Sequence, residues 1–502
     1  MKELLRYTVL CVLAAGVANA ASNRLLVLIS DTHFGVGRDA NGAWNPMEDA
    51  RWAPEFDAFL KEIDRQGKGA TLLVVNGDMF ELWQSVKADC VYPNAVFPDR
   101  NLGCNEKDAV ARLERALKDH GPEMRSLREF AVSGDNRLII VPGNHDAVLL
   151  FPKVAKTLLA RIGAPAERAS VLAQGYWISP DQQIYAEHGH QIGEELNRFD
   201  GWPRPFITVK KTQYIQRPWG EQMVQQFYND YEKKYPVIDN FTDDSIGLGY
   251  GFAAEGKAGS FVGGARFFRM ALFQVSLQQF ARSLGGEAGT HEWDVDKEAL
   301  KGGRFLVESI PQDDPARALA EQTLAGADLG GMTPDEMRDI CDHRQELATA
   351  GRPVQPCATA TAGAAAEKLF RSAKAVMTKH LTETYERLRA SGASTQPFQL
   401  FVYSHTHYAN AGFQPFAGSG SSWNPWVANT GAWQRIVSKE QFEKVMASRK
   451  LSANDALKTI QPEDLPACYD ALVVPPYQSD PDFQLRGWQM VDGKWTLGGK
   501  CR

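Results

Sequence analysis

The chain has 502 residues, of which 44% are hydrophobic and 10% aromatic, which is enough to bury a large core. Charged residues make up 23% with both signs mixed, and the formal net charge of -6 offers no basic surface for a nucleic acid. An anionic substrate must therefore be attracted locally, by metal ions or by a few arginine and lysine side chains.

The first residues have the pattern of an export signal. Lys2 and Arg6 precede the short apolar run Tyr7–Ala18, and Ala18 and Ala20 are small residues of the kind that a signal peptidase requires. The run is too short to span ~30 Å of hydrocarbon. We expect residues 1–20 to be a signal peptide that is removed, which leaves an extracytoplasmic protein, periplasmic or secreted, without a transmembrane segment.

The cysteines agree with export. Cys11 lies in the predicted signal, and the others fall into pairs that are close in sequence: Cys90 and Cys104, Cys341 and Cys357, Cys468 and Cys501. Disulfide bonds persist outside the reducing cytoplasm. We therefore expect these sequential pairs to be disulfide-bonded, with reduced and buried cysteines as the alternative.

Apolar, β-branched runs predict six buried strands separated by helical stretches such as Pro54–Gln66 and Asn105–His120. The predicted strands are Leu25–Ser30, Thr71–Asn76, Leu138–Val141, Ile184–Glu187, Gln399–Ser404 and Trp426–Asn429. This alternation is typical of an α/β fold with strands between helical layers.

The alternation stops near residue 200 and resumes near residue 397. Between these points the pattern is largely helical, with predicted helices at Arg266–Arg282, from Thr333, and at Ala364–Arg389. Another helix is expected to open at Ser438. We expect a catalytic domain at 21–200 and 397–440, a helical insertion or cap at 201–396, and a C-terminal extension at 441–502.

Five of the predicted strands are followed by residues that can bind metal ions. In chain order these are Asp31 and His33, Asp78, Asn144 with His145 and Asp146, His188 and His190, and His405 and His407. The carboxyl ends of strands are where open α/β sheets place their ligands. Each short motif is weak evidence alone. Packing does not require such residues at five strand ends, so their joint occurrence indicates one site.

These blocks resemble the calcineurin-like metallophosphoesterase superfamily, whose pattern is DxH, GD, GNH(D/E), H and GHxH in this order. The resemblance covers residues 24–200 and 397–433. Residues 77–83 are similar to the GDxFExW variant of the UDP-diacylglucosamine pyrophosphatases and their relatives, and residues 429–433 to their NTGxW ending. Ser404 stands where the family usually has glycine, which matters only if the backbone needs a positive φ.

The resemblance implies a four-layer αββα sandwich with a large helical insertion and two divalent metal ions. One ion would be held by Asp31, His33, Asp78 and His407, and the other by Asp78, Asn144, His188 and His405. Imidazole and carboxylate ligands suit Mn, Fe or Zn. His145 would be the acid or phosphate-stabilising residue, and Asp146 would orient its ring. His190 is either a further site contact or a polar loop residue.

The function that follows is hydrolysis of a phosphate ester, as a phosphatase or phosphodiesterase, through a hydroxide that bridges two metals. One alternative is a pyrophosphatase acting on nucleotide-linked lipids or sugars, because the subgroup resemblance points to lipid- or nucleotide-linked substrates. Another is a secreted, non-catalytic binding protein on the same scaffold, although no ligand of the pattern is missing. The acidic balance argues against a nuclease.

Overall fold

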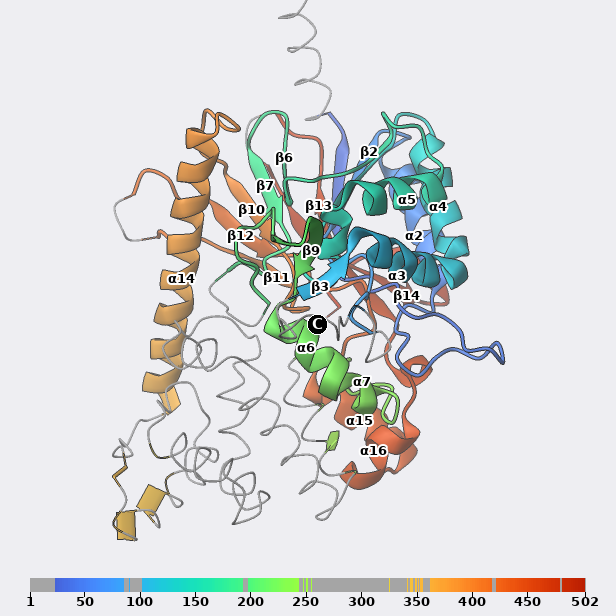
Figure 1. Cartoon of the computed structure of the whole chain (residues 1–502), viewed down its shortest axis with the longest axis vertical. Coiled ribbons are helices and arrows are strands. Elements are labelled where there is room, and N and C mark those ends of the chain that lie inside the picture. The colour runs from blue at the N-terminus through green and yellow to red at the C-terminus, as the bar shows by residue number, and fades with distance from the viewer. Residues whose placement is uncertain are drawn as a thin grey trace, which may run out of the picture.

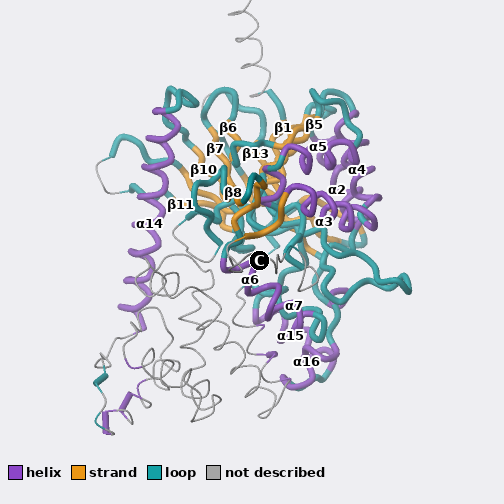
Figure 2. Tube along the Cα trace, viewed as in Figure 1, coloured by secondary structure: helices purple, strands orange, loops and turns teal. Residues whose placement is uncertain are grey.

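The computed structural model describes residues 23–84, 90, 102–192, 197–242, 362–417, 421–478 and 481–501, and isolated positions between 247 and 354. Two β-sheets pack face to face, and helices cover the outer face of each sheet (Figure 1). This is the four-layer αββα sandwich expected from the sequence, and the predicted fold class is confirmed. Figure 2 shows the strands gathered between the flanking helices.

The first sheet has its ligand-bearing strands near its centre. Its order is β15 (Lys494–Leu497), β14 (Gln484–Val491), β13 (Cys468–Val474), β1 (Leu25–Ile29), β2 (Thr71–Asn76), β4 (Arg137–Val141) and β5 (Ala169–Val171). Strands β1, β2, β4 and β5 run parallel. The carboxyl ends of β1, β2 and β4 therefore lie at one edge of the sheet.

The second sheet supplies the remaining ligand-bearing ends. Its order is β11 (Asn410–Phe413), β12 (Trp426–Asn429), β10 (Leu400–Tyr403), β7 (Ile184–Glu187) and β6 (Tyr176–Ile178). Strand β10 runs parallel to both β7 and β12. Each of the six strands predicted from the sequence is present, with bounds that agree within one residue.

The period of two along a strand explains the layers. In β1, Leu26 and Leu28 face the second sheet and pack in a common core with residues such as Ile184 and Val402. The intervening Val27 faces the helices on the other side. Both faces of the strand are thus buried, which is why these strands appear as continuous apolar runs in the sequence.

Four helices cover the first sheet: α2 (Ala53–Gln66), α3 (Glu106–Asp119), α4 (Gly121–Val132) and α5 (Pro152–Ile162). In α2, Phe56, Phe59, Leu60 and Ile63 are buried at helical spacing. The side chain of Asn105 caps α3 by accepting a hydrogen bond from the backbone N–H of Asp108. A short 3-10 helix, η1 (Ala147–Leu150), precedes α5.

The second sheet is covered by α14 (Ala362–Ala390), which confirms the helix predicted at Ala364–Arg389. Figure 1 shows α14 along the outer side of β7, β10 and β12. The residues that it buries against the sheet include Leu381 and Leu388. Although the helix lies in the range expected for an insertion, it forms the fourth layer of the sandwich.

The residues expected to form a C-terminal extension are part of the core. Strand β13 pairs antiparallel with β1, and β14 and β15 continue the same sheet. The ring of Tyr469 in β13 stacks on Trp433, with 4.2 Å between centroids. Residues 468–497, which lie in the range expected for a C-terminal extension, thus complete the first sheet. Helices α15 (Lys439–Arg449), α16 (Ala453–Thr459) and η3 (Pro462–Asp464) lead to β13, and Ser438 caps α15 as predicted.

The start of the expected insertion also contains strands. Strands β8 (Phe206–Val209) and β9 (Thr212–Gln216) form a hairpin that pairs with β3 (Leu102–Asn105). Helix α6 (Trp219–Met223), the π-helical turn η2 (Val224–Tyr228) and α7 (Asn229–Glu232) follow and run toward α15 and α16 (Figure 1). The helices predicted at Arg266–Arg282 and from Thr333 lie outside the described residues.

Two of the expected disulfide bonds are present, Cys90–Cys104 and Cys468–Cys501. The third expected pair includes Cys357, which lies outside the described residues. Among the helices of the described ranges, none combines the length and apolar character needed to cross a membrane.

Candidate metal centre

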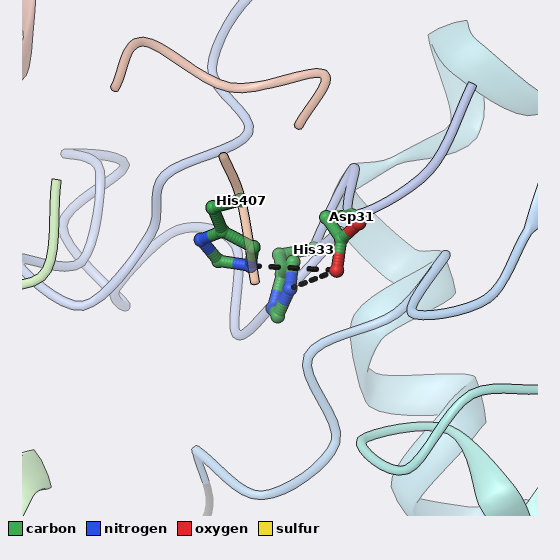
Figure 3. A group of neighbouring side chains, drawn as sticks. All are labelled: Asp31, His33 and His407. Atoms are coloured by element: carbon green, nitrogen blue, oxygen red, sulfur yellow. Dashed lines mark ion pairs between the residues drawn. The ribbon is translucent and has the colours of Figure 1, made fainter. Parts of the chain in front are cut away.

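The carboxyl ends of five strands bring the predicted ligands together. Asp31, His33 and His407 each place one ligand atom within 4.8 Å of the others. Figure 3 shows the rings of His33 and His407 directed at the carboxylate of Asp31. Their Nε2 atoms lie 3.7 Å and 3.4 Å from Asp31 Oδ1. This group matches three of the four ligands predicted for the first ion.

A second group contains Asp78, His188 and His405, again with ligand atoms within 4.8 Å of one another. His188 Nε2 lies 2.8 Å from Asp78 Oδ2 and 3.9 Å from Asp31 Oδ1, so it joins the two groups. The other ring nitrogen of His188, Nδ1, lies 3.0 Å from the carbonyl oxygen of Asn76. A hydrogen bond donated by Nδ1 leaves Nε2 available to a metal ion.

Asn144 is the remaining predicted ligand, and it lies beside the second group. It is fully buried, and neither atom of its side-chain amide has a hydrogen-bond partner. The backbone N–H of the next residue, His145, donates to Asp78 Oδ1 at 2.8 Å. A buried amide without a partner is costly unless an ion or a water satisfies it.

Backbone strain is concentrated on the same residues. Asp31, His33, Asp78, His405 and His407 all have positive φ, between 43° and 72°. Residues other than glycine seldom adopt this region, which costs roughly 1–3 kcal/mol each. The strain turns these five side chains toward a common point.

Two glycines of the motifs allow this close approach. A Cβ atom at Gly77, where φ is 93°, would lie 2.1 Å from His188 Nδ1. A Cβ atom at Gly143 would lie 2.2 Å from Asp78 Oδ1. Any larger residue at either position would displace a predicted ligand, which explains the glycines of the GD and GNH blocks.

The electrostatic environment favours positive charge. Burial would raise the pKa of Asp31, but His188 and neighbouring histidines outweigh it and hold that pKa well below its usual range. Burial would lower the pKa of His188, but Asp78 and Asp31 raise it to about 9. Two divalent cations would satisfy the side-chain atoms of Asp31 and Asn144 that lack hydrogen-bond partners. The strained backbone and the negative carboxylates are consistent with such ions, and so is the donor set.

His145 lies at the edge of the centre, with its ring 4.8 Å from that of His33. Its Nδ1 contacts the carboxylate of Glu81, which also lies 3.0 Å from His33 Nδ1. Trp83 stacks on the other side, 3.9 Å between ring centroids. Burial would raise the pKa of Glu81, but His145 and His33 lower it to about 2, so Glu81 is an anion.

Asp146 has other partners. Its carboxylate accepts hydrogen bonds from the backbone N–H groups of Gly143 at 2.7 Å and Met79 at 2.8 Å. It therefore ties the turn after β4 to the turn after β2. The carboxylate that contacts the ring of His145 is therefore that of Glu81, and not that of Asp146. Sequence reasoning gave Glu81 no role, although the GDxFExW block contains it.

His190 is buried next to the centre, with its ring 5.5 Å from His188 and 6.1 Å from His405. Trp202 packs edge-on against it at 4.3 Å. Burial and the charge of His188 hold the pKa of His190 well below its usual range. It is therefore a neutral ring in the wall of the site. Ser404, the departure from the family pattern, hydrogen-bonds Thr430 at 2.8 Å.

The family model for calcineurin-like phosphoesterases matches residues 25–256, and this match supports the superfamily that the motifs predict. The matched range includes Asp31 to His188, and the structure adds His405 and His407 from beyond it. Neither the curated proteins nor the solved structures gave a match to the chain.

Proposed function

We propose that the protein is an exported, binuclear metal-dependent phosphoesterase that hydrolyses phosphate esters. The observation that carries the proposal is the convergence of the two ligand groups around Asp31 and Asp78. The calcineurin-like family match supports metal-dependent phosphoester hydrolysis as the reaction class. The donor set of imidazoles, carboxylates and one amide suits Mn, Fe or Zn.

Asp31, His33, Asp78 and His407 would hold one ion, and Asp78, Asn144, His188 and His405 the other. Two such ions neutralise charge on phosphoryl oxygens and lower the pKa of a water nucleophile. The protein fixes the positions of these side chains. Asp78 lies between the groups, and its Oδ1 is fixed by the N–H of His145.

We infer that His145 acts on the leaving group or on the phosphate. Glu81 contacts Nδ1 and Trp83 covers one face of the ring, so Nε2 is the ring atom left for proton transfer to the leaving oxygen or for a hydrogen bond to phosphate. Asp146 keeps the turn that carries His145 attached to the turn that carries Asp78.

Two further observations bear on compartment and substrate. The disulfide bonds Cys90–Cys104 and Cys468–Cys501 support an oxidising compartment, periplasmic or extracellular. The GDxFExW resemblance supports a second candidate, a pyrophosphatase for nucleotide-linked lipids or sugars, and the tryptophan of that block stacks on His145.

The test uses the chain without residues 1–20, loaded with Mn. Hydrolysis is compared for a chromogenic phosphate monoester, the corresponding diester and a nucleotide-linked pyrophosphate, before and after chelation and in His145→Ala. Chelator-sensitive turnover that falls at least about 100-fold in His145→Ala supports the proposal. The best substrate then decides among phosphatase, phosphodiesterase and pyrophosphatase. Turnover that survives complete metal removal contradicts it.

A further inference from the structure

A second group of carboxylates lies apart from the predicted catalytic ligands. Asp49, Glu232 and Asp239 each place one oxygen within 4.8 Å of the others. Asp49 belongs to the loop before α2, Glu232 is the last residue of α7, and Asp239 follows in the next turn. Asp49 is 7% exposed and Glu232 is 1% exposed. We call these three residues the acidic cluster.

Two buried amides accompany the acidic cluster. Asn240, 2% exposed, donates from Nδ2 to Asp49 Oδ1 at 3.3 Å, and its own Oδ1 has no hydrogen-bond partner. Gln84, 6% exposed, donates from Nε2 to Glu232 Oε1 at 2.5 Å, and its Oε1 also has no partner. Both side chains thus contact the cluster through their N–H groups, and each carries an oxygen without a hydrogen-bond partner. Gln84 Oε1 lies on the side of Gly35, where an added Cβ would be 2.9 Å from it.

Carboxylates at this separation repel one another when no cation lies between them. Burial and the neighbouring carboxylates raise the pKa of Glu232 well above its usual range. Burial, only partly offset by Arg51, raises the pKa of Asp49 to about 7. The guanidinium of Arg51 is already occupied, because it pairs with Glu463 at 3.2 Å and bonds the carbonyl oxygen of Glu48 through Nε.

We propose that the acidic cluster, with the side-chain oxygen of Asn240, binds one hard divalent cation of the Ca²⁺ type. The donors are all oxygens, three carboxylates and one amide, and Ca²⁺ takes six to eight oxygen ligands, the remainder being water or backbone carbonyls. The catalytic centre differs because it is rich in imidazole, which suits transition metals. The two sites therefore select different ions.

The bound ion would fasten α7 and the following turn to the catalytic domain. Asp49 and Gln84 belong to the loops around the metal centre, whereas Glu232, Asp239 and Asn240 belong to the segment that leaves it. Two backbone contacts already hold this segment: the N–H of Val437 donates to Asn240 at 2.8 Å, and that of Thr242 to Val437 at 3.0 Å.

The cluster also adjoins the residues that hold His145. Gln84 directly follows Trp83, and the side chain of Asn229 in α7 donates to the carbonyl oxygen of Trp83 at 3.5 Å. Cation binding is therefore expected to stabilise the packing of α7 against Trp83. The proposal concerns a structural ion and does not depend on the phosphoesterase reaction.

The experiment measures binding of Ca²⁺ alone to the chain without residues 1–20, with the catalytic centre preloaded with Mn. Equilibrium dialysis with radioactive Ca²⁺ gives the stoichiometry and Kd, and thermal unfolding with and without Ca²⁺ gives the change in Tm. The variants are Asp49→Asn and Glu232→Gln. Glu440→Gln, which removes an exposed carboxylate in α15, is the control.

The wild type and Glu440→Gln are expected to bind about one Ca²⁺ per chain and to gain Tm with it. Asp49→Asn and Glu232→Gln are expected to bind at least tenfold more weakly and to lose the gain. Without Ca²⁺ both are expected to be as stable as the wild type or more so, because each removes a carboxyl group from the crowded cluster. If either fails to fold, the half-buried Asp239→Asn replaces it.

Two results would overturn the proposal. One is a wild type that binds no Ca²⁺ and shows no change in Tm, which would mean that protonation neutralises the cluster. The other is Ca²⁺ binding that is unchanged in Asp49→Asn and Glu232→Gln, which would place the ion at the catalytic centre or elsewhere.

Discussion

The indole of Trp83 stacks on the imidazole of His145, with 3.9 Å between ring centroids and 26° between ring planes. Glu81, two residues earlier, contacts Nδ1 of the same imidazole and lies 3.0 Å from Nδ1 of His33. Asp78, three residues before Glu81, belongs to the second ligand group. One turn after β2 therefore supplies a predicted metal ligand, the partner of two histidine rings and the aromatic ring that covers the proposed acid.

Replacement of Glu81 by Gln is expected to lower kcat about 10–100-fold, the usual cost of losing a residue that orients a metal-site histidine. The amide cannot supply the anionic oxygen that His33 and His145 share. The measurement is kcat and KM with the best substrate, together with metal content.

Asp146→Asn is the comparison for Glu81→Gln. Its carboxylate bonds backbone N–H groups of two turns, so this variant is expected to lower Tm and metal content together. If Glu81→Gln keeps the wild-type kcat and only Asp146→Asn loses activity, then Asp146, and not Glu81, positions the ring of His145.

Trp83 is expected to act through the ring that it covers. Trp83→Phe keeps an aromatic face and should retain most of kcat. In Trp83→Ala, kcat should be about two- to tenfold lower than in Trp83→Phe, since an aromatic pair is worth about 0.5–1.5 kcal/mol. Steady-state kinetics below the Tm of both variants checks this. Equal kcat values for Trp83→Phe and Trp83→Ala would show that the stack does not position His145.

The sequence predicted which side chains gather at the site, because each predicted ligand directly follows a strand that is recognisable by itself. It could not predict Glu81 as a ring partner, because that contact joins the turn after β2 to the turn after β4. Asp146 was chosen for its adjacency to His145, but neighbouring side chains on a tight turn diverge. Strand β13 was also missed, since it carries no motif and pairs with β1 across more than 400 residues.

His120 gives a pH dependence of stability. Its Nε2 lies 3.3 Å from Glu48 Oε2 and its Nδ1 3.6 Å from Glu123 Oε1, with all three side chains buried. Burial would lower the pKa of His120, but Glu48 and Glu123 raise it to about 10. A raised pKa contributes stability that is complete below the unfolded value of about 6.5 and is lost as pH rises toward about 10.

The free energy of unfolding is therefore expected to fall between about pH 7 and 10 in the wild type. His120→Gln removes the charge, so it should lose about 3–5 kcal/mol at neutral pH and show a flatter alkaline slope. Urea unfolding across this range measures both. Parallel slopes in the two proteins would show that another group controls the alkaline decline.

The disulfide bond Cys468–Cys501 is expected to hold the edge of the first sheet. It joins the start of β13 to the chain beyond β15 and has a sequence separation of 33, against 14 for Cys90–Cys104. In the chain-entropy account, a longer loop is the more stabilising, by about 4 against about 3 kcal/mol. Cys501→Ser should therefore lower the free energy of unfolding more than Cys104→Ser, in urea titrations without reductant. Because β13 pairs with β1, which is followed by the predicted ligand Asp31, Cys501→Ser is also expected to weaken Mn retention. A loss of stability in Cys501→Ser with Mn retention unchanged would show that the outer strands only support the sheet. Equal stability of Cys501→Ser and the wild type would show that the pairing of β13, β14 and β15 needs no covalent link.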